Sequence, residues 1–172
     1  MPQEAVFKQS VKYIKGVGES RAGLLAKLGI FTVNDVLNYF PREYEDRSVT
    51  KKIAGVNDGE ECGVKASLVS DVAETRPRRN LHILRALVSD GSAFLSVTWF
   101  NQDYVKKNLQ KGMEYIFFGK IKRSGMRIEM QNPVVEKSEL QGRNTGRILP
   151  VYPLTKGVTQ NVLRSLVENS LR

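Results

Sequence analysis

Two aromatic side chains, Phe100 and Tyr104, have the types and the spacing to stack on nucleobases. Residues 93–100 alternate between apolar and polar, which is typical of a half-buried strand that ends at Phe100. Asn101 is a favourable N-cap, so the sequence predicts a helix over about residues 102–111. The two rings are therefore expected where a strand passes into a helix.

The angular position of Tyr104 decides whether the two rings meet at one exposed corner. The apolar stripe of the predicted helix is Val105 and Leu109, and Tyr104 lies about 100° away from it, beside the end of the strand. Aromatic residues four apart more commonly cover the rim of a barrel, and the pattern alone favours that interpretation. Exposure for base stacking is the alternative hypothesis.

The elements that must position these rings follow a recognisable order. Strand patterns are predicted over 60–71, 81–89, 93–100, 115–122 and 127–131, with the helix between the third and fourth strands. Three strands, a helix and two strands are expected of an OB-fold, a five-stranded Greek-key barrel that binds nucleic acid on one face. The sequence therefore predicts a mainly β chain with a helical N-terminus.

Basic residues gather in the two predicted loops that flank the binding face of such a barrel. One loop spans 74–80 and the other spans 120–127. Together they are expected to contact DNA phosphates, because Lys and Arg neutralise a polyanionic backbone without reading sequence. The residues predicted to do so are Arg76, Arg78, Arg79, Lys122, Arg123 and Arg127.

The N-terminal segment is predicted to be helical, with helices over 4–15 and 19–28 and a third that begins after Thr32. Gly16 and Gly18 form a helix-hairpin-helix-like turn whose N–H groups could hold a phosphate, although a simple C-cap turn is the alternative. The predicted division is 1–50 helical segment, 51–146 barrel, and 147–172 connector and helix. The last helix lacks a C-cap, which suggests that a further domain follows.

Charge and composition limit the classes of partner that the chain is expected to bind. The formal net charge is +9, and residues 61–172 carry +8 of it, which favours a polyanionic partner such as nucleic acid. The single cysteine, Cys62, excludes an internal disulfide and fits a reducing cytoplasm. We expect no membrane segment, no metal site and no catalytic residues, and neither Cys62 nor the lone His82 is assigned a role.

Three segments carry a resemblance to a known family. They are Gly16-Val17-Gly18 through Leu28-Gly29-Ile30 into Asp35-Val36-Leu37, then Phe40 to Ser48, and last Pro150 to Gly157. In these the chain resembles the N-terminal wedge region of the bacterial RecG branched-DNA helicases. The resemblance implies an OB-fold that sits at a DNA fork, and it implies that Phe100 and Tyr104 stack on bases where the strands part.

The resemblance also implies a parent that is an ATP-driven translocase, which reverses replication forks and migrates Holliday junctions. ATP and Mg²⁺ would bind to motor domains of the same polypeptide. This chain has no Gly-x-x-x-x-Gly-Lys-Ser/Thr phosphate loop, so we expect it to have no cofactor and no enzymatic activity of its own. Its expected partner is branched or forked DNA, bound by a monomer.

Two other interpretations of a basic OB-fold stay open. The chain could be a protein-interaction module that binds an acidic peptide, such as the tail of a single-strand-binding protein. It could also bind RNA, which would require a contact that senses the 2′-hydroxyl group.

Overall fold

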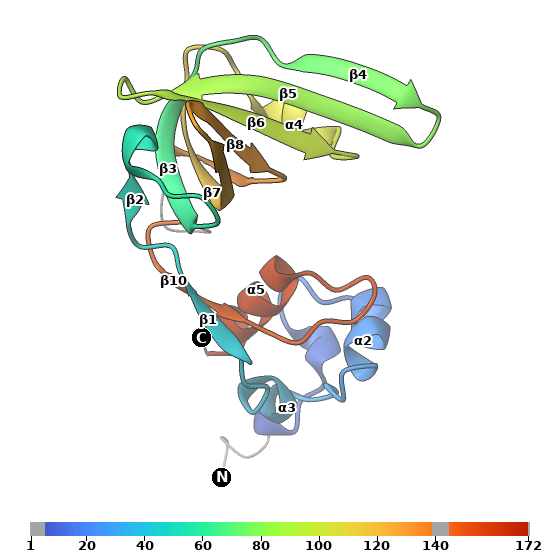
Figure 1. Cartoon of the computed structure of the whole chain (residues 1–172). Coiled ribbons are helices and arrows are strands. Elements are labelled where there is room, and N and C mark those ends of the chain that lie inside the picture. Colours follow the sequence, from blue (N-terminus) through green and yellow to red (C-terminus); the bar gives the residue numbers. More distant parts are fainter. Residues whose placement is uncertain (1–5, 139–144, 172) are drawn as a thin grey trace. The chain divides into compact units, whose positions relative to one another are not determined.

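The computed structural model describes residues 6–138 and 145–171, which form two units (Figure 1). One unit combines the two ends of the chain, Met1–Glu45 and Leu149–Arg172, and the other is Asp46–Ile148. The segment 147–172, predicted to be a separate connector and helix, therefore belongs for the most part to the same unit as the N-terminal helices.

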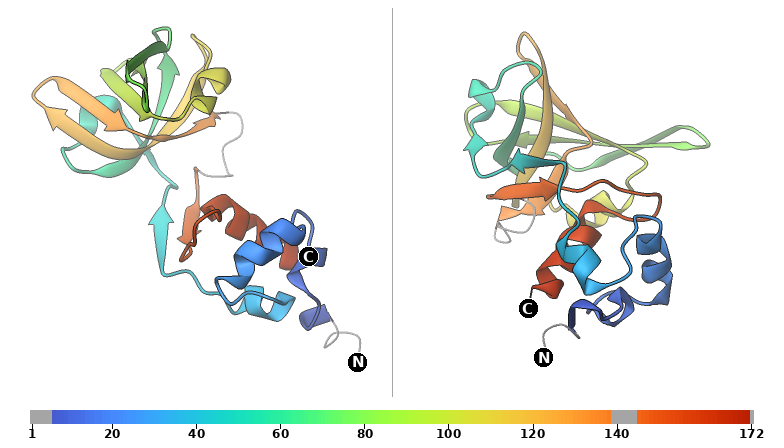
Figure 2. Two further views of the ribbon diagram at one scale, coloured as in Figure 1. Left: turned by 90° about the vertical axis from the view of Figure 1, so that its right-hand side faces the viewer. Right: turned by 90° about the horizontal axis from the view of Figure 1, so that it is seen from below.

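The larger unit is a closed barrel. Its strands follow the hydrogen-bonded order β3 (Glu61–Leu68), β5 (Leu81–Ser89), β6 (Phe94–Phe100), β8 (Arg127–Gln131) and β7 (Glu114–Ser124). β7 pairs again with β3, which closes the barrel. β6 and β8 run parallel and the other pairs are antiparallel (Figures 1 and 2). This is the five-stranded OB-fold that the sequence predicts.

Short elements surround the barrel. β2 (Thr50–Lys51) runs parallel to β3, and the 3₁₀ helix η2 (Ile53–Gly55) follows it. β4 (Ala73–Arg78) pairs with β5, and β9 (Val134–Lys137) pairs with β7. The helix α4 (Tyr104–Asn108) lies between β6 and β7 in the chain, as predicted.

The alternation of β6 sets the core of the barrel. Leu95, Val97 and Trp99 are fully buried, whereas Phe94 on the other face is exposed. The indole Nε1 of Trp99 donates a hydrogen bond to the carbonyl oxygen of Pro133 at 3.1 Å, so burial leaves no unpaired donor there. Strand β6 is thereby fixed in register, and so is the residue at which it ends.

The smaller unit contains the 3₁₀ helix η1 (Val11–Tyr13) and the helices α2 (Glu19–Ala26), α3 (Val33–Leu37) and α5 (Gln160–Ser170). It also contains most of a two-stranded ribbon of β1 (Glu43–Asp46) and β10 (Ile148–Val151). Its core joins residues from both ends of the chain, among them Leu25, Val36, Leu163 and Leu166. As predicted, α3 begins directly after Thr32, which forms a capping box with Asp35; Thr159 caps α5 in the same way, through its side-chain oxygen.

Two predictions for the smaller unit hold only in part. Within the described part of the predicted helix 4–15, Val6 and Phe7 are helical, but a turn and η1 follow, because Ser10 bridges Thr32 and the N–H of Val11 donates to the carbonyl of Phe31. These backbone pairings compete with helical ones. The polar segment after Pro41 has charges of both signs, which predict a salt-linked connector. Arg42 does form an ion pair with Glu43 at 3.1 Å, but the segment also contains β1, which β10 pairs from the other end of the chain.

Candidate nucleic-acid interface

The first predicted basic loop is a β-hairpin arm, which we define as β4, the turn at Arg79 and Asn80, and the start of β5. Thr75 pairs with Ile83, and the register shifts before Arg78 pairs with Leu81. Every residue of β4 is exposed, and the arm projects from the barrel (Figures 1 and 2). The prediction of a loop was wrong because β4 buries no face and so lacks apolar alternation; its backbone pairs with β5 instead.

The three arginines of the arm are all exposed. Nη2 of Arg76 lies 3.2 Å from Oε1 of Glu74, which is a surface contact of small strength. Arg78 and Arg79 form no ion pair with any of the described residues. Their guanidinium groups are therefore available to an external anion.

The second predicted loop, 120–127, is mostly strand. β7 continues to Ser124, a tight turn at Gly125 (φ 61°) follows, and β8 begins at Arg127. Residues 121–124 of β7 pair antiparallel with residues 127–130 of β8, so most of the predicted loop belongs to these two strands. Lys122 and Arg127 are exposed, and Nη2 of Arg127 lies 2.6 Å from Oε1 of Glu129.

Arg123 occupies a structural position. Its Nη1 donates hydrogen bonds to the carbonyl oxygens of Ala54 at 3.1 Å and Val56 at 2.7 Å, and its backbone N–H donates to Oδ1 of Asp58 at 2.7 Å. The side chain is half-buried. Its guanidinium thus satisfies carbonyls around η2, which would compete with a phosphate for the same donors.

The two rings differ in exposure. Phe100 ends β6 and is half-buried, whereas the side chain of Tyr104, the first residue of α4, is 64% exposed. α4 has five residues, fewer than predicted, and Asn101 does not cap it. Asn101 instead has φ 55°, a left-handed conformation that asparagine tolerates, and the helix begins two residues later than expected.

A cleft of about 460 Å³ brings the arm and Tyr104 together. Tyr104 lines it from the start of α4, together with Arg79 and Asn80 of the arm turn. The volume falls within the ordinary range for a small ligand, roughly 300 to 1,000 Å³. Phe100 and the residues of the β7–β8 hairpin do not line this cleft. Its lining is Arg76, Arg79, Asn80, Leu81, His82, Asn101, Asp103 and Tyr104.

His82 and Asp103 are members of the cleft that the sequence did not identify as functional. The side chain of His82 is 12% exposed, and its Nδ1 contacts Oδ1 of Asp103. A lone histidine between two apolar residues gives no signal by itself. The pairing of β5 with β6, which sets Ile83 opposite Phe100, would have placed His82 beside Asn101.

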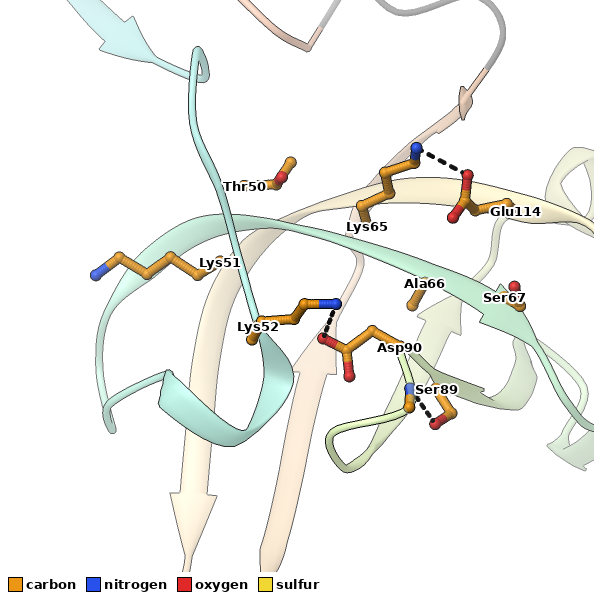
Figure 3. A pocket seen from close by; sticks show the side chains of 10 residues that line it. Thr50, Lys51, Lys52, Lys65, Ala66, Ser67, Ser89, Asp90 and Glu114 are labelled. Atoms are coloured by element: carbon orange, nitrogen blue, oxygen red, sulfur yellow. Dashed lines mark hydrogen bonds and ion pairs between the residues drawn. The ribbon is translucent and has the colours of Figure 1, made fainter.

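A second hollow in the barrel unit, of about 510 Å³, is lined by Lys51, Lys52 and Lys65 among other residues (Figure 3). Nζ of Lys65 lies 2.9 Å from Oε2 of Glu114, and Nζ of Lys52 lies 4.0 Å from Oδ2 of Asp90. These carboxylates neutralise much of the positive charge. The cleft between the arm and Tyr104 is the more suitable of the two for a nucleic acid.

The glycine turn of the smaller unit has the expected left-handed residue. Gly16 has φ 87°, and Gly18 is the N-cap of α2. Nη1 of Arg21 donates to the carbonyl oxygen of Gly16 at 2.5 Å, and Lys15 lies beside them at a hollow of about 390 Å³. The proposal that Gly16 and Gly18 hold a phosphate stays a prediction.

A thiol nucleophile, a metal site and a membrane-spanning helix have little support in the described residues. Burial raises the pKa of the Cys62 thiol, which disfavours the nucleophilic thiolate. No group of three or more His, Cys, Asp or Glu side chains among residues 6–138 and 145–171 could hold a metal ion. None of the helices described is both long and apolar enough to cross a membrane.

Comparisons with known proteins agree with this fold. The "ATP-dependent DNA helicase RecG" of Thermotoga maritima is 35% identical over 171 residues, which are 98% of this chain and 22% of that protein. The protein of the same name from Escherichia coli K12 is 32% identical over 92% of this chain and 23% of its own length. The chain thus spans about a fifth of the length of these relatives.

A solved structure gives the same result in three dimensions. The "Structure of RecG bound to three-way DNA junction" superimposes with a TM-score of 0.82 and 37% identity, over 94% of this chain and 22% of that one. The family model described as "RecG wedge domain" matches residues 10–172. The chain therefore belongs to the RecG wedge domain family.

Proposed function

We propose that this chain is the DNA-junction-binding wedge module of a RecG-type helicase, which acts in replication fork reversal and Holliday junction branch migration. One observation carries the proposal: a single cleft joins the exposed ring of Tyr104 to arginines on a projecting arm. A ring that can stack on a base thereby lies next to cations that can hold the adjoining phosphates. The RecG structure bound to a three-way DNA junction supports it.

The mechanism that fits is passive strand separation. The arm holds a duplex arm of the junction through phosphates, and Tyr104, with Phe100 at the end of β6, caps the last base pairs. Stacking on an aromatic ring contributes roughly 1 to 3 kcal/mol per base, and one duplex stacking step is worth about 1.4 kcal/mol. Two rings could therefore hold an opened junction but could not drive it open.

Opening the duplex against base pairing requires a motor. The relatives are named ATP-dependent helicases. We place ATP and Mg²⁺ in motor domains of the same polypeptide, because this chain has no Gly-x-x-x-x-Gly-Lys-Ser/Thr segment. Under this proposal the chain acts in the cytoplasm as a monomer and has no enzymatic activity alone.

The test is a comparison of affinities for forked DNA, plain duplex, single strand and an acidic peptide that carries the tail sequence of a single-strand-binding protein. The proposal expects the fork to bind most tightly, since only the fork offers both unpaired bases and duplex phosphates. An Arg78→Gln, Arg79→Gln variant should lose affinity for every DNA. Tightest binding of the acidic peptide would instead favour the protein-interaction module.

A further inference from the structure

The turn that presents Tyr104 is not stabilised by its own helix. α4 has only five residues, and the side chain of its N-cap, Asp103, makes no capping hydrogen bond. A helix this short is unstable without tertiary contacts. The Tyr104 ring is held from outside α4: its hydroxyl donates a hydrogen bond to Oε1 of Gln102, in the turn before the helix, at 2.9 Å.

His82 on β5 binds this turn through its backbone. The N–H of Asn101 donates to the carbonyl oxygen of His82 at 2.8 Å, and the N–H of His82 donates to Oδ1 of Asn101 at 2.9 Å. These two hydrogen bonds hold Asn101 in its left-handed conformation, φ 55°. The position of the turn relative to β5 is thereby fixed.

The imidazole of His82 binds the same turn a second time and connects it to the arm. Its Nδ1 contacts Oδ1 of Asp103. Its Nε2 lies 2.9 Å from Oε1 of Glu74 on β4, within ion-pair distance although outside hydrogen-bond geometry. The other oxygen of Glu74 accepts a hydrogen bond from Nζ of Lys106 on α4 at 2.7 Å.

We propose that His82 is a positioning residue for the stacking ring: its imidazole links the arm to the turn before α4, so that Tyr104 keeps a fixed distance from the arginines that hold phosphate. This inference rests on the proposed function. An imidazole ring carries N–H groups at both nitrogens when it is protonated, and in that form it can face two carboxylates at once, one on β4 and one in the turn. If His82 only filled space, the orientation of Tyr104 would depend on neither of these contacts.

A double-mutant cycle of His82→Ala and Tyr104→Ala tests this link in the full chain. Fork and duplex affinities are measured for the wild type, both single variants and the double variant, with a thermal melt of each. Quenching of 2-aminopurine at the first unpaired base of the fork reports stacking directly. Leu87→Ala, a truncation on the same strand at a partly exposed position, is the matched control.

Tyr104→Ala alone should weaken fork binding by about 5- to 150-fold, the range expected for one stacked base. His82→Ala should weaken fork binding by at least about threefold and lessen the quenching, with duplex affinity unchanged. In the His82→Ala background the further loss from Tyr104→Ala should be at least about threefold smaller, because the two residues act through one contact. Leu87→Ala should leave the effect of Tyr104→Ala unchanged.

Two results would overturn the role of His82 while leaving the proposed function intact. One is a cycle in which the two losses multiply to within about twofold, as expected of independent sites. The other is an equal loss of fork and duplex binding with unaltered quenching. If Tyr104→Ala itself has no effect on fork binding, the proposed function fails. If His82→Ala does not fold, His82→Gln, which keeps an amide donor, takes its place in the cycle.

Discussion

The two rings differ at the level of single residues, and this difference predicts separate effects on stability. Truncating the half-buried ring in Phe100→Ala should cost about 1 to 3 kcal/mol of unfolding free energy, less than a fully buried phenylalanine. Tyr104→Ala removes an exposed ring and should cost under about 0.5 kcal/mol. Thermal or urea melts of both variants check this, and equal losses would show that Tyr104 is part of the core.

Arg123 and Arg127 lie on one hairpin, but truncating them to alanine should destabilise the fold to different extents. Arg123→Ala leaves the carbonyls of Ala54 and Val56 without their donor, and we expect a loss of about 1.5 to 3 kcal/mol. Arg127→Ala removes a surface ion pair with Glu129 and should cost about 0 to 1 kcal/mol. Urea unfolding of the two variants measures the contrast. An Arg123 variant that stays stable but binds DNA weakly would contradict the structural role.

At the scale of elements, the arm should determine much of the salt dependence of DNA binding. Each phosphate contact that is lost reduces the slope of log K against log salt by about 0.9 for duplex DNA. Replacing Arg78 and Arg79 by Gln should therefore flatten the slope by up to about 2. A charge-matched variant with Lys111 and Lys137 replaced by Gln is the control, since both lysines are exposed and lie outside the cleft. Equal changes in both variants would show that only net charge matters.

The barrel elements were predictable where apolar residues alternate. The alternation of Leu95, Val97 and Trp99 predicted β6 and its buried face. The same kind of alternation predicted the other barrel strands, and their order along the chain indicated the OB-fold. The capping residues Thr32 and Thr159 gave the start of two helices, because these signals are local. Local patterns therefore indicated the frame of the molecule and the strand end at Phe100, but not that Phe100 is half-buried and lies outside the cleft that Tyr104 lines.

Features that depend on distant partners could not be read from the sequence. β4 exists because β5 pairs with it, although its own residues bury nothing. The guanidinium of Arg123 donates hydrogen bonds to carbonyl oxygens more than sixty residues away in the chain. The residues next to His82 in the sequence are apolar and do not indicate that Glu74 and Asp103 lie at its ring nitrogens. Only the fold brings these groups together.

For the whole molecule, ion pairs between elements should make the fold sensitive to acid. A hydrogen bond from Lys106 lowers the pKa of Glu74, and one from Lys65 lowers the pKa of Glu114; the ordinary value for both is 4.5. A carboxyl whose pKa is lower in the folded state contributes stability above its ordinary pKa and loses it as the pH falls through the folded value. The urea midpoint should therefore be constant from about pH 7 to about pH 5 and fall below that.

A matched variant tests the origin of that acid sensitivity. Glu74→Gln with Glu114→Gln removes both titrating groups, so the fall of the urea midpoint below about pH 5 should be smaller than in the wild type. The variant should also be somewhat less stable near neutral pH. An identical acid profile in both proteins would assign the sensitivity to other carboxyls, such as Asp35, whose pKa is lowered by the backbone N–H of Phe31.

We propose that the exposed corner around Tyr104 recognises the point where DNA strands part. The most direct measurement is the ratio of fork to duplex affinity for Phe100→Ala, Tyr104→Ala, taken together with its thermal melt. We expect a loss of about 2 to 6 kcal/mol in fork binding if both rings stack, with duplex binding little changed. A variant that melts far lower yet keeps the fork preference of the wild type would contradict this role, because the rings would then be covering the barrel.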